Sequence, residues 1–214
     1  MKIFNTNDLA NMDTRYRAAF MNSLGGFKSV VLIGTQNAQG QSNLAIFNSL
    51  VHLGANPPLC GIVVRPDVSR RHTLENILET KQYTINHLNE DIYIQAHQTS
   101  ARFLELESEF EMVNFTPQYV PNIHPPFVAQ SEVKFACEFK QRIDLEINGT
   151  SLIIGEIIHV SMPNDILCSD GYIDIEKAGS VAGSGLDSYH LTQRLARLTY
   201  AKPNTWPVKL SHEN

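Results

Sequence analysis

Two β-rich runs joined by Asn148-Gly149 are the strongest structural signal in this sequence. The runs read KFACEFKQRIDLEI before the dipeptide and TSLIIGEIIHVSM after it. Asn-Gly favours a type I′ turn, whose twist matches that of a two-residue β-hairpin. The pattern therefore predicts an antiparallel hairpin near the C-terminal end of the fold.

The N-terminal half carries further strand signals. The β-branched run Val30–Ile33 is followed by the polar turn QNAQGQ and then by a second mixed apolar segment. Gly40 can supply the positive φ that such a turn needs. The continuous apolar run Leu59–Val64 is typical of a strand buried on both faces. These segments predict another hairpin and a buried strand.

Helical patterns are fewer. Thr73 is a candidate N-cap for a helix whose apolar spacing begins at residues 74–78. Residues 91–101 and 189–197 also read as helices. Residues 108–128 contain several prolines and little periodicity, which predicts a long loop that acts as a lid or a binding wall.

About six strands with few helices favour an antiparallel barrel or sandwich over a parallel α/β sheet. The G-x-G-x-x-G loop of dinucleotide-binding folds is missing, and GSVAGSGLDSYH reads only as a glycine-rich loop. At 214 residues, we expect a single domain covering residues 1–214.

Composition excludes several classes of protein. A net charge of −5 gives no basic footprint for nucleic acid. The sequence shows no secretory signal and no apolar run long enough for a membrane span, so we expect a cytoplasmic protein. Three widely spaced cysteines predict buried reduced thiols rather than disulfides. Eight histidines lack H-E-x-x-H spacing and G-x-S-x-G is absent, so neither a metal site nor a serine nucleophile is expected.

The stretch DVSRRHT is a local concentration of positive charge on an acidic chain. It places Ser69, Arg70, Arg71, His72 and Thr73 at the start of the predicted helix. A helix N-terminus attracts anions, and arginine can donate two hydrogen bonds to one phosphate. The stretch is therefore either a phosphate-binding segment or a solvated turn before a capped helix.

Five polar side chains interrupt the apolar pattern of SNLAIFNSLVHL. They are Ser42, Asn43, Asn48, Ser49 and His52. Polar groups within core strands need hydrogen-bond partners. Neighbouring turns would supply these partners in one interpretation, and a polar aromatic ligand lying along the strand would supply them in the other.

The order of these pieces resembles the flavin reductase-like, FMN-binding split-barrel family. The resemblance rests on VVLIGTQNAQGQSNLAIFNSLVHLGANPPLCGIVVRPDVSRRHTLENILETKQYTINHL, on LEINGTSLIIGEIIHV with Gly155-Glu156, and on AGSVAGSGLDSYH. It extends from about Arg15 to Tyr200. No single motif is very specific to this family, but the complete set in this order is.

The resemblance implies a mainly β fold with peripheral helices, an antiparallel Greek-key split β-barrel. It also implies that FMN binds with its ring against the second strand, largely through backbone groups, and with its phosphate at the SRRHT segment. The implied cofactor-binding residues are Asn43, Leu44, Ala45, Ile46, Phe47, Asn48, Ser49, Ser69, Arg70, Arg71, His72 and Thr73.

The implied activity is that of an oxidoreductase, an NAD(P)H-dependent flavin reductase acting as a homodimer and serving a partner monooxygenase. Gly183, Ser184, Tyr189 and His190 are the candidates for the substrate side of the site. Two alternatives stay open from the sequence. One is an FMN-binding carrier or sensor without reductase turnover, and the other is a barrel that binds another phosphate-bearing ligand.

Overall fold

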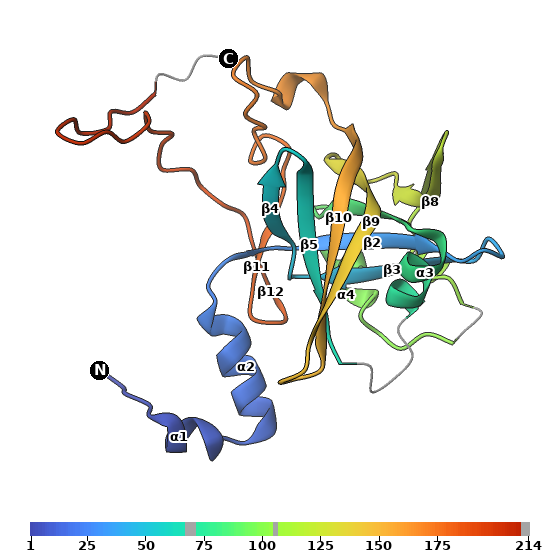
Figure 1. The fold of residues 1–214 in the computed structure, drawn as a ribbon, viewed down its shortest axis with the longest axis horizontal. Helices are drawn as coiled ribbons and strands as arrows, with labels where there is room; N and C mark the ends of the chain where they lie inside the picture. The colour runs from blue at the N-terminus through green and yellow to red at the C-terminus, as the bar shows by residue number, and fades with distance from the viewer. Residues whose placement is uncertain (67–71, 105–106, 211–214) are drawn as a thin grey trace.

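A computed structural model describes residues 1–66, 72–104 and 107–210. The fold is mainly β (Figure 1). Seven antiparallel strands form one sheet in the order β3-β2-β6-β9-β10-β5-β4. Their bounds are β2 Val31–Gln36, β3 Ser42–Phe47, β4 Val51–Ala55, β5 Pro58–Val64, β6 Gln82–His87, β9 Lys134–Leu145 and β10 Thr150–Ser161.

Shorter elements surround this sheet. The remaining strands are β1 Lys28–Ser29, β11 Ala182–Ser184 and β12 Ser188–His190, which pair together, and β7 Pro117–Val120 with β8 Ile123–Val128. The helices are α1 Thr6–Ala10, α2 Thr14–Leu24, α3 His72–Thr80, α4 Tyr93–Gln98, α5 Glu109–Met112 and the short 3₁₀ turn Asn164–Ile166. None of the helices in the described ranges is long and apolar enough to cross a membrane.

Chain connectivity forces the sheet to curl into a barrel. β3 and β4 form opposite edges of the seven-stranded sheet, yet only residues 48–50 join them. Seven flat strands would separate the edges by roughly 29 Å at 4.8 Å per strand. The link from Phe47 to Val51 reaches at most about 14 Å. The two edges must therefore approach each other, as the predicted antiparallel split barrel requires.

The predicted hairpin is confirmed, but its turn differs from the prediction. β9 and β10 pair over their full length, with Leu145 opposite Thr150, so the loop has four residues instead of two. Among those four, only Gly149 has a positive φ, at 69°. A type I′ turn needs positive φ at two central residues. Gly149 still supplies a positive φ, but in a four-residue loop.

Two other predicted segments are wrong. Residues 108–128 are not a loop, because they form α5 and the β7–β8 pair and bury Phe110 and Phe127. Pro125 and Pro126 made β8 look unlike a strand in the sequence, because proline has no backbone N–H to donate. β8 pairs only with the short β7, so it tolerates these two prolines. Residues 189–197 are not a helix, because Tyr189 pairs with Gly183 in β12 and the chain after it is irregular.

Side chains from β5, β6, β9 and β10 meet in a compact part of the core. Tyr83 is fully buried, and its hydroxyl lies beside the Cys60 and Cys137 thiols without a hydrogen bond of good geometry in the described part of the chain. A Cβ added to Gly155 would lie 2.1 Å from that hydroxyl oxygen. Burial raises the pKa of Tyr83 well above its usual range. The glycine is therefore needed for close packing against a phenol that stays neutral.

Two cysteines flank the same glycine. Cys60 and Cys137 are buried, with their sulfur atoms 3.5 Å apart, whereas Cys168 is half-buried, which corrects the prediction that all three are buried. Cys60 lies on β5 and Cys137 on β9, on either side of β10. Strands two apart are separated by roughly 9–10 Å, beyond the Cα distance of about 7 Å that a disulfide tolerates.

We therefore expect the two buried thiols to stay reduced and protected. A thiol reagent such as DTNB should modify one cysteine or fewer per native chain and three after unfolding in guanidinium. The Cys168→Ser variant should react at none in the native state. Fewer than three reactive thiols after unfolding without reductant would reveal a disulfide and contradict the prediction.

His87 makes stability depend on pH. Its Nδ1 lies 3.1 Å from the Ser180 hydroxyl, and burial lowers the pKa of His87 to about 4. The unfolded chain takes up this proton near pH 6.5, so the contribution is complete above that pH and is lost as the pH falls toward 4. The loss attributable to His87 is at most ~3 kcal/mol. Urea unfolding from pH 7 to 4 should give a steeper decline for wild type than for His87→Gln, and parallel declines would contradict this.

Candidate functional site

Among the described residues, no strand pairs with the outer backbone edge of β3. β3 is the last strand of the sheet, and the Leu44 N–H points away from β2 and donates to the Glu109 carboxylate at 3.0 Å. Backbone groups alternate in direction along an antiparallel strand. The Ile46 N–H therefore faces the same outer edge. A row of such backbone groups can form hydrogen bonds with the polar atoms at the edge of a planar ligand.

α3 is fastened beside this strand by buried polar contacts. The Asn43 amide donates to the Thr73 hydroxyl at 3.1 Å, and the Asn76 amide donates to the Thr35 hydroxyl at 3.1 Å. The helix begins at His72, so Thr73 lies inside its first turn and is not the N-cap that the sequence predicted. The N-terminus of α3 consequently lies next to β3.

The remaining phosphate candidates fall outside the described residues. Ser69, Arg70 and Arg71 belong to residues 67–71, for which the structure gives no description. His72 and Thr73 are the described members of the SRRHT segment. Their side chains lie at the helix end that favours anions.

The β11–β12 turn meets the far end of β3. The Asn48 amide donates to the Gly185 carbonyl at 3.1 Å. Tyr189 and Ile46 pack against the same core cluster, and the Tyr189 hydroxyl lies 2.8 Å from Nδ1 of His97. The β11–β12 hairpin, which carries the candidate substrate-side residues, therefore lies next to β3, the strand implied to contact the flavin.

The four substrate-side candidates differ in their surroundings. Ser184 Oγ lies 2.8 Å from Nε2 of His190, whose ring contacts Phe27 edge-on. Gly183 is buried, and a Cβ there would lie 2.3 Å from a methyl group of Val30. Gly183 is thus required for packing, whereas Ser184 and His190 form a polar pair beside the β11–β12 turn.

Some predicted cofactor residues use their side chains elsewhere. The Ser49 hydroxyl donates to the Val63 carbonyl at 3.0 Å and accepts from the Val63 N–H at 3.1 Å, which fixes the crossover from β3 to β4. The Leu44 side chain is fully buried in the core. Leu44 can therefore meet a ligand through its backbone only, whereas Ala45, Ile46, Phe47, Asn48 and Ser49 are half-buried.

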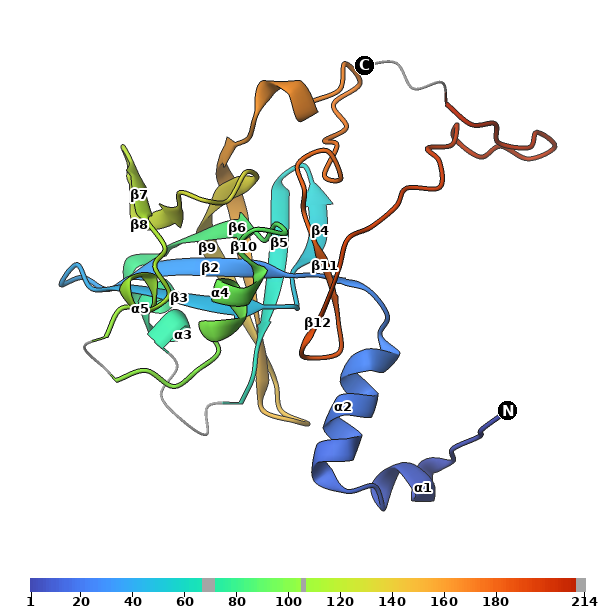
Figure 2. The same ribbon diagram turned by 180° about the vertical axis from the view of Figure 1, so that it is seen from behind.

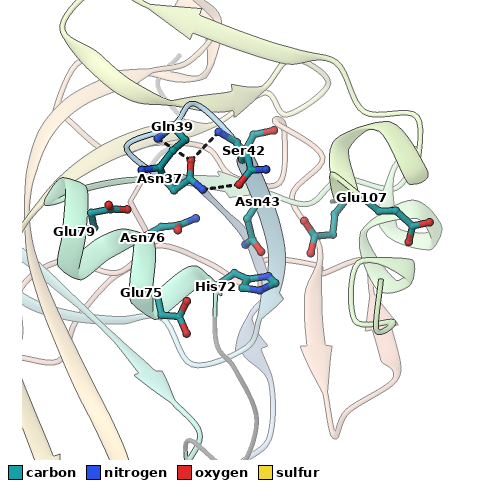
Figure 3. Close-up of a pocket in the computed structure, with 11 residues that line it drawn as sticks. Asn37, Gln39, Ser42, Asn43, His72, Glu75, Asn76, Glu79 and Glu107 are labelled. Carbon is teal, nitrogen blue, oxygen red and sulfur yellow. Dashed lines mark hydrogen bonds between the residues drawn. The ribbon is translucent and has the colours of Figure 1, made fainter. Parts of the chain in front are cut away.

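A polar cavity of about 430 Å³ opens beside Asn43 and His72. Figure 3 shows both side chains at this cavity, with Glu75 and Glu79 of α3 on one side and Glu107 on the other. Glu109 also lines it, and burial raises the pKa of its carboxyl group. Four carboxylic acids make the cavity a poor place for a phosphate. His72, which begins α3, also lines the cavity, so the end of the cavity beside the helix N-terminus suits a phosphate best.

Sequence reasoning missed Glu109, which lies 65 positions from the backbone group that it binds. It falls within the stretch interpreted as a loop, and no spacing rule links it to Leu44. His97 was missed for the same reason, because its contact with Tyr189 spans 92 positions. The described ranges contain no group of three or more His, Cys, Asp or Glu that could hold a metal ion.

Comparison with known proteins identifies the family. A family model described as the flavin reductase like domain matches residues 24–173. The chain therefore belongs to the flavin reductase-like family, and its fold is the family's split β-barrel. Proteins of this family are oxidoreductases whose chemistry involves flavin. The assignment of residues 1–214 to one domain stays a prediction.

Three solved structures illustrate the likeness. A protein from Shewanella frigidimarina NCIMB 400, described as a flavin reductase with split barrel domain, is 49% identical, with a TM-score of 0.91 over 94% of this chain and 100% of its own. Nitrilotriacetate monooxygenase component B from Bacillus cereus is 21% identical, with a TM-score of 0.81 over 92% and 98%. Flavoredoxin of Desulfovibrio vulgaris (Miyazaki F) is 20% identical, with a TM-score of 0.69 over 84% and 92%.

Proposed function

We propose that this protein is an NAD(P)H-dependent flavin reductase that binds FMN along the outer edge of β3. One observation carries the proposal. The strand that the resemblance assigns to the flavin ring contacts the implied phosphate segment at one end and the candidate substrate-side hairpin at the other, through the Asn43–Thr73 contact and the Asn48–Gly185 contact. The open backbone edge between them fits the polar rim of an isoalloxazine ring.

The chain's own residues have distinct roles in this proposal. Backbone groups from Asn43 to Ser49 orient the ring, while the half-buried side chains of Ile46 and Phe47 point to opposite sides of the strand and pack against two different core clusters. Ser69, Arg70, Arg71, His72 and Thr73 hold the phosphate. FMN held by these residues would supply the hydride and electron-transfer chemistry, so the role of the chain is binding and orientation. No triad or metal is needed for that chemistry.

The substrate side of the site is assigned to the β11–β12 turn. Ser184, Tyr189 and His190 border the position where a nicotinamide would stack on the flavin, and Gly183 keeps this hairpin close to β1. The Tyr189–His97 contact fixes the phenol. Because burial raises the pKa of Tyr189, we expect its hydroxyl to stay protonated and able to donate.

Absorbance spectra test the proposal. The protein, as purified or after addition of FMN, should show the flavin bands, and anaerobic NADH or NADPH should bleach them within seconds. Bound FMN without bleaching would instead indicate a carrier or sensor. A chain that takes up no FMN would leave a barrel for another phosphate-bearing ligand and would overturn the proposal.

The proposal extends to the protein's associations. We propose a homodimer located in the cytoplasm that supplies reduced flavin to a monooxygenase. A neighbour in fold is named as component B of a monooxygenase, which supports this role. Mixing the protein with a flavin-dependent monooxygenase and NADH should produce hydroxylated product only when FMN is present.

A further inference from the structure

The polar cavity begins at the phosphate end of the proposed flavin site. α3 and α5 flank the first residues of β3 (Figure 2), since Asn43 contacts Thr73 and the Ser42 hydroxyl lies 2.9 Å from that of Ser108. The cavity of about 430 Å³ lies between these two helices and the β2–β3 turn, and His72 lines one end of it. A ligand group that extends beyond a phosphate at the α3 N-terminus would therefore enter this cavity.

One face of α3 brings carboxylates to the cavity. The residues of this helix that line it have the i, i+3, i+4 and i+7 spacing of a single helix face, and they are His72, Glu75, Asn76 and Glu79. At about 1.5 Å per residue, Glu79 lies roughly 10 Å along the helix axis from His72. Figure 3 shows Glu107 on the opposite side of the cavity. A group that leaves the helix N-terminus through the cavity therefore moves toward negative charge.

Backbone hydrogen bonds hold three of the cavity's carboxylates in place. They accept from N–H groups of three different segments, at 3.2 Å from Ala38 to Glu79, 2.8 Å from Leu104 to Glu107 and 3.0 Å from Leu44 to Glu109. No salt bridge within the described ranges neutralises any of the three. The carboxylates cannot turn away from the cavity without losing these hydrogen bonds, so their charge stays beside it.

Charge, rather than space, is the barrier that this cavity presents to a nucleotide. Its volume falls in the range of about 300–1,000 Å³ that is usual for small-molecule sites. Amide side chains of the β2–β3 turn, Asn37, Gln39 and Gln41, also line it and can form hydrogen bonds. A like charge about 4 Å away, however, weakens binding about fivefold in bulk water, and more where water is partly excluded.

We propose that Glu79, Glu107 and Glu109 make this site selective for FMN over flavin adenine dinucleotide (FAD). The inference rests on the flavin site proposed above and adds a specificity determinant to it. FAD carries a second phosphate and an adenosine beyond the phosphate that the two flavins share. With the shared phosphate at the α3 N-terminus, the second phosphate of FAD enters the acidic cavity, whereas FMN ends before it. Riboflavin has neither phosphate, so the carboxylates do not affect its binding.

Titration of the flavin-free protein with FMN, FAD and riboflavin tests this selectivity. The wild type should bind FMN ~100-fold more tightly than FAD, as repulsion from several carboxylates predicts. Glu79→Gln with Glu107→Gln removes two charges and keeps an oxygen that can accept from the same backbone N–H groups. FAD should bind this double variant ~10-fold more tightly than the wild type, with a smaller change for FMN. Such a gain in affinity cannot arise from damage to the fold.

Glu111→Gln is the matched control. Glu111 lies on the same helix as Glu109, but it is exposed and does not line the cavity. This variant should keep the wild-type ratio of FMN to FAD affinity, and riboflavin should bind all three proteins alike. Ionic strength gives a second readout, because salt screens exposed charges. Added salt should reduce the ratio in the wild type and change it less in the double variant.

The outcomes separate this inference from the proposed function. A wild type that binds none of the three flavins would refute the flavin site and the selectivity together. A wild type that binds FMN and FAD equally well would refute the selectivity and leave the flavin site standing. A preference for FMN that the double variant retains unchanged would overturn the assignment of selectivity to these carboxylates.

Discussion

Replacing Arg70 and Arg71 together by alanine is expected to weaken FMN binding by ~100-fold while leaving riboflavin binding within a few-fold of wild type. Only FMN carries the phosphate that the two guanidinium groups would contact. Each charge-assisted hydrogen bond contributes about 1.5–3 kcal/mol, and 1.4 kcal/mol corresponds to a tenfold change in affinity. Fluorescence titration of both ligands measures the difference.

The control for this variant removes the same charge elsewhere. Lys140→Ala with Arg142→Ala deletes two exposed cations of β9 that pair with neighbouring carboxylates. This variant should bind FMN as the wild type does. An equal loss of FMN and riboflavin affinity in the Arg70/Arg71 variant would refute the phosphate assignment, since general damage affects both ligands alike.

Gly155→Ala is expected to destabilise the fold by about 2–3 kcal/mol, because overpacking of a tight core costs about 1–3 kcal/mol and occasionally more. The new methyl carbon would lie 2.1 Å from the hydroxyl oxygen of Tyr83 and 2.8 Å from the ring carbon that bears it. Neither Tyr83 nor Cys137 can withdraw, because both are fully buried. Urea unfolding measures the loss.

Tyr83→Phe provides the compensating change. It removes the atom nearest to the added methyl group and also a buried hydroxyl that has only weakly polar thiols, Cys60 and Cys137, beside it among the described residues. Alone it should stabilise the protein by about 1 kcal/mol. Combined with Gly155→Ala it should recover more than that, so the two effects should not add. Simple additivity in the double-mutant cycle would contradict the direct contact.

The sequence predicted those parts of the fold that depend on local patterns. The β9–β10 hairpin follows from two β-rich runs around a turn dipeptide, and α3 follows from apolar residues at helical spacing. Buried Leu74 and Ile77 confirm the spacing in α3. Local patterns alone left an antiparallel barrel or a sandwich open, and the split barrel was implied by the family resemblance of the ordered motifs.

Long-range contacts account for what the sequence did not predict. Ser42–Phe47 and Val51–Ala55 read as one segment, yet they form opposite edges of the sheet. Leu191, Leu195 and Leu198 have helical spacing, but all three side chains are exposed, so no core on their own chain stabilises a helix. The carboxylate of Glu109 reaches β3 from α5 across 65 positions of sequence, a contact that no local pattern indicates.

We propose that the flavin lies along the edge of β3 between α3 and the β11–β12 turn. Hydrogen exchange measured by mass spectrometry with and without FMN tests this position. We expect slower exchange in peptides covering residues 43–49, 72–80 and 183–190, and little change in residues 117–128 of β7 and β8. Protection confined to other parts of the barrel, with residues 43–49 unchanged, would contradict it.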